Sequence, residues 1–261
     1  MPEPMKQPPP LLEQSSSAET RRRMSFPARL LNIFAVPGEV FSEVKSAPHS
    51  ISNWLVPSIL GAIVGAISVV VMLSQPTIQK QVHDRQALLL DKAARAGKLT
   101  SQERMAAEKF TGPAALKLFG VAGAVVGSFL SVLWWAFLLW LLGRLLLKVP
   151  LAFNKTLEIA GLSMMVNVLG GMVALLLITQ LGQGETASHL AASVKDFDNA
   201  RKGHLFGIAA TIFAFWVVGV RSIGLARLAD VPYLRAAWLV VGCWILEQSL
   251  LVLTGLGQLA T

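Results

Sequence analysis

The chain has 261 residues, of which 54% are hydrophobic and 15% are charged, and its mean hydropathy is +0.58. This composition excludes an ordinary soluble domain, in which about 25% of residues are charged, and indicates a membrane protein. The net charge of +8 does not indicate a nucleic-acid partner, because the basic residues are scattered and do not form a stripe with aromatic side chains. The phosphates of the lipid bilayer are the expected counter-charge.

The N-terminal fifth of the chain precedes the first apolar stretch. Residues 1–25 are rich in proline, serine and charge, which predicts a disordered basic tail. Residues 26–50 are predicted to be an amphipathic segment, in which Phe41 and Val44 fall on one helical face and Glu43 on the other. Such a segment lies in the membrane interface or packs against the end of a helix bundle, and the sequence leaves both alternatives open.

The remaining residues, 51–261, are predicted to form the membrane domain. A spanning helix needs about 20 predominantly apolar residues, and four stretches reach that length. A fifth, Leu205–Val220, is shorter but can span if His204 and Arg221 extend to the two interfaces. The fold class is therefore an all-α bundle of five transmembrane helices, and the predicted spans are 54–74, 114–145, 157–181, 204–226 and 234–257.

The loop between the first two spans carries its own helix signals. Pro76 suits a helix start and Gly97 a helix stop. Thr100 and Glu103 have the spacing of a capping box, which begins a second helix. A short helical hairpin outside the bilayer is therefore predicted between spans one and two.

Small residues recur four apart within the spans, notably Gly61 with Gly65 and Gly123 with Gly127. This spacing lets helix backbones approach closely where lipid gives no hydrophobic driving force. The pairs predict close helix packing, either inside a compact bundle or in a homo-oligomer.

One carboxylate, Glu247, stands within the last apolar stretch, about 20 Å from its start. A charge at that depth costs roughly 3 kcal/mol on insertion scales, so a partner is expected. Gln248 is its neighbour, and Asn167 on the third span lies at a comparable depth and could hydrogen-bond the carboxyl. These residues form either an interhelical hydrogen-bond clamp, the preferred interpretation, or part of a relay or polar substrate site.

Motifs for catalysis and for metal or cofactor binding are not found in the sequence. The four histidines are widely separated, and no pair has the spacing of a helical metal site. No phosphate-binding Gly-Lys-Ser/Thr loop exists, and Gly161–Met165 has only the beginning of a nucleophile elbow. The sequence predicts a protein that is not an enzyme and needs no metal or cofactor.

The segment FAVPGEVFSEVKSAPHSISNWLVPSILG resembles the Ypt/Rab-interacting protein (YIP) domain family, in its bacterial branch. The matching elements are Pro37–Phe41, the following Lys45–Pro48, and Trp54 with Pro57 at the start of the first span. The resemblance continues through KLTSQERMAAEKF and VVGVRSIGLARLADVPYLRAAWLVV, and covers about residues 27–255.

The resemblance implies a five-helix fold with a cytoplasmic N-terminus and a C-terminus outside, in the bacterial inner (plasma) membrane. Eukaryotic members bind prenylated Rab GTPases, but their tyrosine-containing signatures are absent here, where the single tyrosine is Tyr233. Rab binding is therefore not expected. The leading hypothesis is a non-enzymatic protein that organises membrane or protein partners, and the alternative is a small transporter or channel subunit that uses Glu247.

Overall fold

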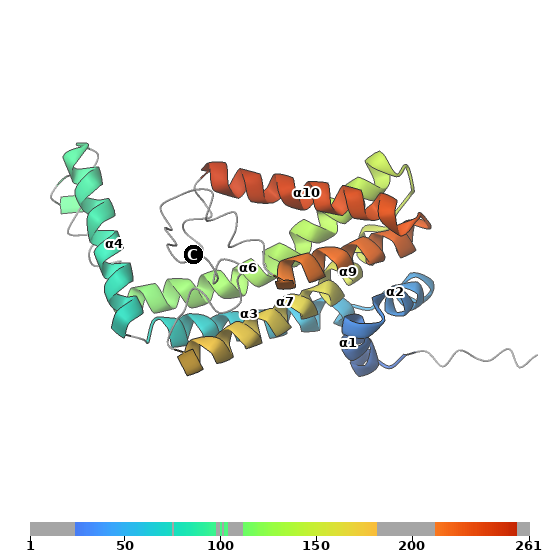
Figure 1. Cartoon of the computed structure of the whole chain (residues 1–261), viewed down its shortest axis with the longest axis horizontal. Helices are drawn as coiled ribbons and strands as arrows, with labels where there is room; N and C mark the ends of the chain where they lie inside the picture. Colours follow the sequence, from blue (N-terminus) through green and yellow to red (C-terminus); the bar gives the residue numbers. More distant parts are fainter. Residues whose placement is uncertain are drawn as a thin grey trace, which may run out of the picture.

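The computed structural model describes residues 24–74, 76–97, 100, 102–103, 112–181 and 212–254. These residues form helices, and Figure 1 shows their arrangement. In chain order, the helices are α1 (Phe26–Ala35), α2 (Pro37–Ser46), α3 (Ser52–Met72), α4 (Pro76–Arg95), α6 (Pro113–Leu141), the π-helical turn η1 (Leu142–Leu146), α7 (Phe153–Leu181), α9 (Ile212–Ala229) and α10 (Tyr233–Thr254).

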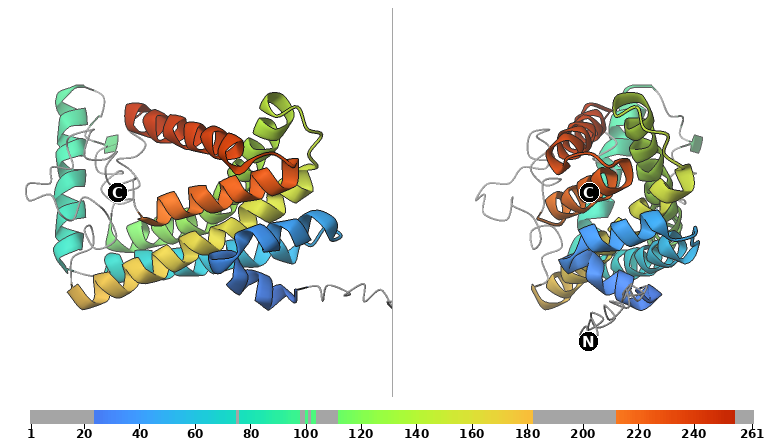
Figure 2. Two further views of the ribbon diagram at one scale, coloured as in Figure 1. Left: turned by 45° about the vertical axis from the view of Figure 1, so that its right-hand side comes forward. Right: turned by 90° about the vertical axis from the view of Figure 1, so that its right-hand side faces the viewer.

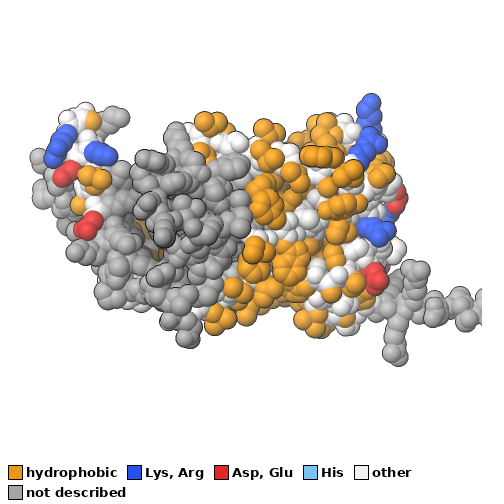
Figure 3. Space-filling view, viewed as in Figure 1, with side chains coloured by type: hydrophobic (Ala, Val, Ile, Leu, Met, Phe, Trp, Pro, Cys, Tyr) orange, Lys and Arg blue, Asp and Glu red, His pale blue; other side chains and the backbone are white. Residues whose placement is uncertain are grey.

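Five helices in the described chain are long and apolar enough to cross a membrane, which confirms the predicted fold class. Their spanning segments are Ser52–Met72, Ala114–Leu146, Phe153–Leu176, Ile212–Ala229 and Tyr233–Leu253. The second stretch is one continuous span, as its uninterrupted apolar sequence predicts. In Figure 3, hydrophobic side chains dominate the described surface of the bundle beside the grey atoms, whereas the charged side chains visible there lie towards the two ends of the molecule.

The helices α1 and α2 lie at one end of the bundle, and α4 lies at the opposite end (Figures 1 and 2). The turns 147–152 and 230–232 are at the same end as α1 and α2, because α6 and α9 end there and α7 and α10 begin there. We call this the cap end of the bundle.

The amphipathic helices pack against the bundle. The apolar face of α2 is buried, with Val40, Phe41 and Val44 each no more than 1% exposed, and it packs mainly on α9. From α1, the ring of Phe34 meets that of Trp216 on α9 edge to face, with centroids 5.9 Å apart. The two helices therefore pack against the end of the bundle, and their position in the membrane interface stays a prediction.

The loop after α3 begins as the sequence predicts. Helix α4 starts at Pro76, and Gly97 ends it with a φ of +65°, a conformation that favours glycine. Glu103 accepts hydrogen bonds from the backbone N–H and the hydroxyl of Thr100, both at 2.8 Å, which lowers the pKa of its carboxyl. The capping box is thus confirmed, and the second helix of the predicted hairpin falls outside the described residues.

The turn between α9 and α10 has a Schellman-type geometry. The backbone N–H of Val231 donates to the carbonyl of Ala226 at 3.1 Å, while Asp230 takes a φ of +53°. Aspartate tolerates this left-handed conformation better than most residues. The chain therefore makes a tight turn between Leu228 and Tyr233, and this turn directs α10 back along α9.

Helices α3 and α7 cross most closely at Gly161. A methyl group at this position would lie 2.2 Å from the Cα atom of Trp54 and 2.8 Å from the carbonyl oxygen of Asn53. Both atoms belong to the backbone of α3, so a larger side chain would require the two helices to separate. Since Glu158 lies one turn before Gly161, this contact also brings Asn53 next to the Glu158 carboxylate.

Candidate functional site

A buried carboxylate lies at the cap end, in the second turn of α7. Glu158 has no exposed surface, and its Oε2 accepts a hydrogen bond of 2.5 Å from Nδ2 of Asn53, which is also fully buried. Its Oε1 lies 3.1 Å from Nζ of Lys155 and 3.0 Å from Nδ1 of His49. Three polar partners therefore surround one buried carboxylate, which is what a charge removed from water requires.

Lys155 also closes the end of α2. Its Nζ donates to the carbonyls of Val44 and Ala47, both at 2.7 Å. Carbonyls at the end of a helix have no partner within the helix, and a cation there interacts favourably with the helix dipole. Through this one side chain, α2 is attached to the buried carboxylate on α7.

Arg29 extends the same cluster into α1. Its Nη2 forms an ion pair with Oε1 of Glu43 on α2 at 2.8 Å, and both side chains are less than one-fifth exposed. Its Nη1 lies 3.5 Å from Oδ1 of Asn53. The other carboxylate oxygen of Glu43 accepts the backbone N–H of Met24 at 3.0 Å.

These contacts join four helices into one polar cluster at the cap end. The cluster holds α1 and α2 against α3 and α7, and its charges partly neutralise one another within the bundle. We call it the cap network, and its members are Arg29, Glu43, His49, Asn53, Lys155 and Glu158.

The contacts of the cap network were not predicted from the sequence. The predicted third span places Glu158 in its first turn, where a carboxylate is usually solvated, so the residue gave no signal by itself. A signal existed in combination, because Asn53 and Glu158 fall at the ends of two neighbouring spans that face the same side of the membrane. Polar residues at matching ends of two spans are candidates for contact with each other.

The intramembrane carboxylate Glu247 contacts α6. Its Oε1 accepts a hydrogen bond of 2.9 Å from Nε1 of Trp134. It also attracts Arg221 on α9, which is only 4% exposed and whose guanidinium lies 3.9 Å from the ring centre of Trp135. Nε of Arg221 is buried without a hydrogen-bond partner in the described part of the chain. Glu247 thus has a neutral donor and a nearby cation within the bundle.

The other predicted members of this site lie apart from it. Nδ2 of Asn167 is 3.6 Å from the sulfur of Met164 on its own helix, and the described chain contains no hydrogen bond between Asn167 and Glu247. The physical reason is the packing order of the helices, because α10 packs mainly on α9 and not on α7. Gln248 is partly buried, and its side chain makes no hydrogen bond to the residues described.

The two predicted glycine pairs have different surroundings. A methyl group at Gly61 would lie 2.7 Å from Cε of Met164, and one at Gly65 would lie 3.2 Å from Cβ of Ala124, so this pair lies where α3 packs closely on its neighbours. A methyl group at Gly123 or Gly127 would meet nothing within 4 Å in the described chain. The second pair therefore faces away from the bundle.

No group of three or more His, Cys, Asp or Glu side chains in the described ranges is arranged to hold a metal ion. Cys243 on α10 is a free thiol and is partly buried. Two hydrogen bonds between side chains join described spans, from Asn53 to Glu158 and from Trp134 to Glu247. Polar contacts of this kind can hold neighbouring helices together, change when a side chain gains or loses a proton, or bind a polar ligand.

The five spanning helices and the polar contacts between them define a multi-pass, all-α integral membrane protein. The chain belongs to the Yip1 domain family, whose model matches residues 31–255. This match covers most of the chain and confirms the resemblance seen in the sequence. Yip1 domain proteins are membrane proteins and are not known as enzymes.

Comparisons with curated proteins and with solved structures found no significant match.

Proposed function

We propose that this protein is a non-enzymatic membrane protein that organises membrane or protein partners through the outer surface of α1 and α2. The observation that carries the proposal is the cap network, since Lys155 and Arg29 fix both short helices on the bundle. A surface that is already ordered loses little conformational entropy when a partner binds. The serine side chains at Ser42 and Ser46, one turn apart on α2, point away from the bundle and are exposed.

We further propose that the cap end faces the cytoplasm of a bacterium, with the C-terminus outside the inner (plasma) membrane. The family membership supports this orientation, because the resemblance to YIP proteins implies a cytoplasmic N-terminus. The distribution of Lys and Arg favours it slightly. In this orientation, α1 and α2 are accessible to cytoplasmic proteins.

Crosslinking in the native membrane tests the partner hypothesis. After gentle solubilisation, mass spectrometry is expected to identify a defined protein partner in stoichiometric amount. The double variant Ser42→Arg and Ser46→Arg changes the outer face of α2 without altering a buried group, so it is expected to lose that partner and keep its thermal stability.

The matched control is Leu88→Arg, at an exposed position on α4 at the opposite end of the bundle. It is expected to retain the partner. Equal capture by all three proteins would contradict a role for the α2 surface. Recovery of the protein alone, or only with copies of itself, would favour the second function below.

A second candidate function is that of a small transporter or channel subunit. The observation that favours it is the position of Glu247 beside Trp134 and near Arg221 inside the spans. Ionisable residues within spans commonly belong to substrate or proton pathways. The competing interpretation is a hydrogen-bond clamp between α10 and α6.

Two substitutions at Glu247 separate these interpretations. The clamp predicts that Glu247→Gln keeps the thermal stability in detergent, because glutamine retains an acceptor for Nε1 of Trp134. Glu247→Leu removes the acceptor and is expected to lower stability by about 0.6–2 kcal/mol. Trp134→Phe, which removes the donor, is the matched control and is expected to cost a similar amount. Equal stability of the Gln and Leu variants, together with loss of a pH-dependent flux in Glu247→Gln, would favour transport.

A further inference from the structure

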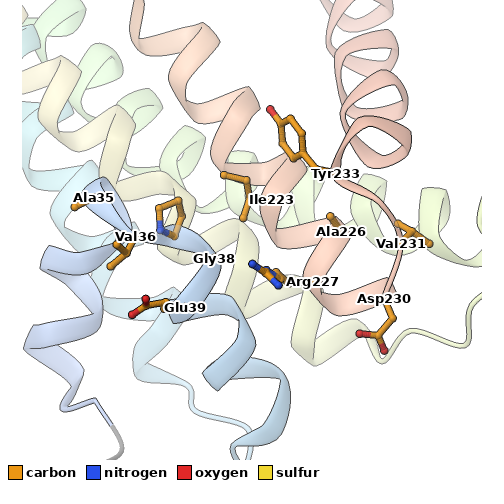
Figure 4. A pocket seen from close by; sticks show the side chains of 11 residues that line it. Ala35, Val36, Gly38, Glu39, Ile223, Ala226, Arg227, Asp230, Val231 and Tyr233 are labelled. Atoms are coloured by element: carbon orange, nitrogen blue, oxygen red, sulfur yellow. The ribbon is translucent and has the colours of Figure 1, made fainter.

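A cavity of 790 Å³ opens at the cap end, between the joint of α1 with α2 and the turn that connects α9 with α10 (Figure 4). Its volume is within the range of about 300–1,000 Å³ that is typical of small-molecule sites. Most of its walls are apolar, and the charged lining residues are Glu39, Arg227 and Asp230.

Two oppositely charged side chains in this cavity have no partner among the described residues. The guanidinium of Arg227 lies beside the start of α2, with Nη2 3.3 Å from the point where a methyl group on Gly38 would stand. The side chains of Arg227 and Glu39 form no hydrogen bond or ion pair with the described residues, and both residues are exposed. Figure 4 shows the Glu39 carboxylate directed away from Arg227. By contrast, Asp230 is paired with Lys45.

The cavity lies at the level where the spans end. The span of α9 ends at Ala229 and that of α10 begins at Tyr233, and residues on both sides of this turn line the cavity. Beyond the hydrocarbon, about 5–8 Å of each leaflet consists of headgroups, so a cavity at the end of two spans is at headgroup depth. Tyr233 also lines the cavity, and tyrosine is enriched at the depth of the lipid headgroups.

We propose that this cavity binds the headgroup of a zwitterionic aminophospholipid, in which the phosphate is bound by Arg227 and the ammonium by Glu39. Arginine presents several N–H donors in a planar group that matches a phosphate, and a carboxylate accepts from an ammonium group. An anionic lipid such as phosphatidylglycerol offers the phosphate but no cation for Glu39, only the weaker hydroxyl donors of its glycerol. The apolar wall formed by Val36, Ile223 and Ala226 would contact the glycerol and the first acyl carbons. This site does not depend on the partner-binding function proposed above.

Native mass spectrometry of the full chain in detergent tests the proposal, with phosphatidylethanolamine, phosphatidylglycerol and soluble phosphoethanolamine as probes. We expect one bound phosphatidylethanolamine and weaker binding of phosphatidylglycerol. Arg227→Gln removes the charge-assisted hydrogen bonds to phosphate and is expected to weaken binding of both lipids roughly tenfold or more. Arg235→Gln, at an exposed arginine of α10 that does not line the cavity, is the matched control and is expected to bind like the wild type.

Substitutions of Glu39 test the headgroup assignment. Glu39→Gln is expected to abolish the preference for ethanolamine over glycerol. Glu39→Lys is expected to reverse the preference, so that phosphatidylglycerol binds more tightly than phosphatidylethanolamine. Misfolding could weaken binding of both lipids, but it could not create a new preference for one of them. Equal binding by the wild type and Arg227→Gln, or an unchanged preference in Glu39→Lys, would overturn the proposal.

Soluble phosphoethanolamine is expected not to displace the lipid at equal concentration. If it binds as tightly, the natural ligand is a soluble phosphate compound and the lipid assignment is wrong.

Discussion

The variant Gly161→Ala is expected to lose stability by about 1–3 kcal/mol, the cost typical of an added methyl group in a packed core. The new Cβ would lie 2.2 Å from the Cα atom of Trp54, well inside van der Waals contact. A flexible side chain could turn away, but a helix backbone cannot, so α3 and α7 must move apart as units. Unfolding in mild detergent, followed by circular dichroism, measures the loss.

The control for this prediction is Gly123→Ala. A methyl group at Gly123 would meet no atom within 4 Å in the described chain, so only the intrinsic helix preference changes. Alanine is the better helix former, and the control is expected to keep or slightly raise the stability. If both alanine variants unfold alike, the close crossing at Gly161 does not contribute to stability in the way that we infer.

Gly161 also shows which parts of the fold the sequence could predict. The five spans were predictable because apolar length alone defines them, as in Ser52–Met72. The small-residue spacing correctly indicated close packing at Gly61 and Gly65, yet the same spacing at Gly123 and Gly127 faces outward. Spacing places two residues on one face of a helix, but it does not say which helix lies opposite that face.

The two carboxylates within the spans illustrate the same limit for the candidate sites. Glu247 was evident in the sequence because it interrupts an apolar stretch, but its hydrogen-bond donor, Trp134, depends on how α10 lies over α6. Glu158 was not evident, because it stands near the end of a span. Its partner Lys155 also binds carbonyls at the end of α2, a contact that only the fold creates. Depth along a helix can be counted from the sequence, whereas the neighbours at that depth follow from tertiary packing.

The variant Glu158→Ala is expected to have the largest effect of those considered, a loss of about 3 kcal/mol, because it leaves the partly buried Lys155 without its counter-charge. Lys155 would keep its bonds to the carbonyls of Val44 and Ala47 but lose the carboxylate that neutralises it. Release of α2 from the bundle is the expected structural consequence. A cysteine at position 44, which is fully buried, reports this release by maleimide labelling in a Cys243→Ala background.

The matched control for this prediction is Asp230→Asn, because asparagine also tolerates the positive φ at this position. Lys45 and Asp230 also join α2 to the end of α9, but the Asp230 side chain is 80% exposed, and exposed ion pairs contribute only about 0–1 kcal/mol. The control should therefore leave Val44→Cys protected, whereas Glu158→Ala should make it reactive in the intact membrane. If the cysteine stays protected in both variants, the apolar packing of Phe41 and its neighbours on α9 is sufficient to hold α2. The cap network would then not be what fixes the α2 surface on which the proposed function depends.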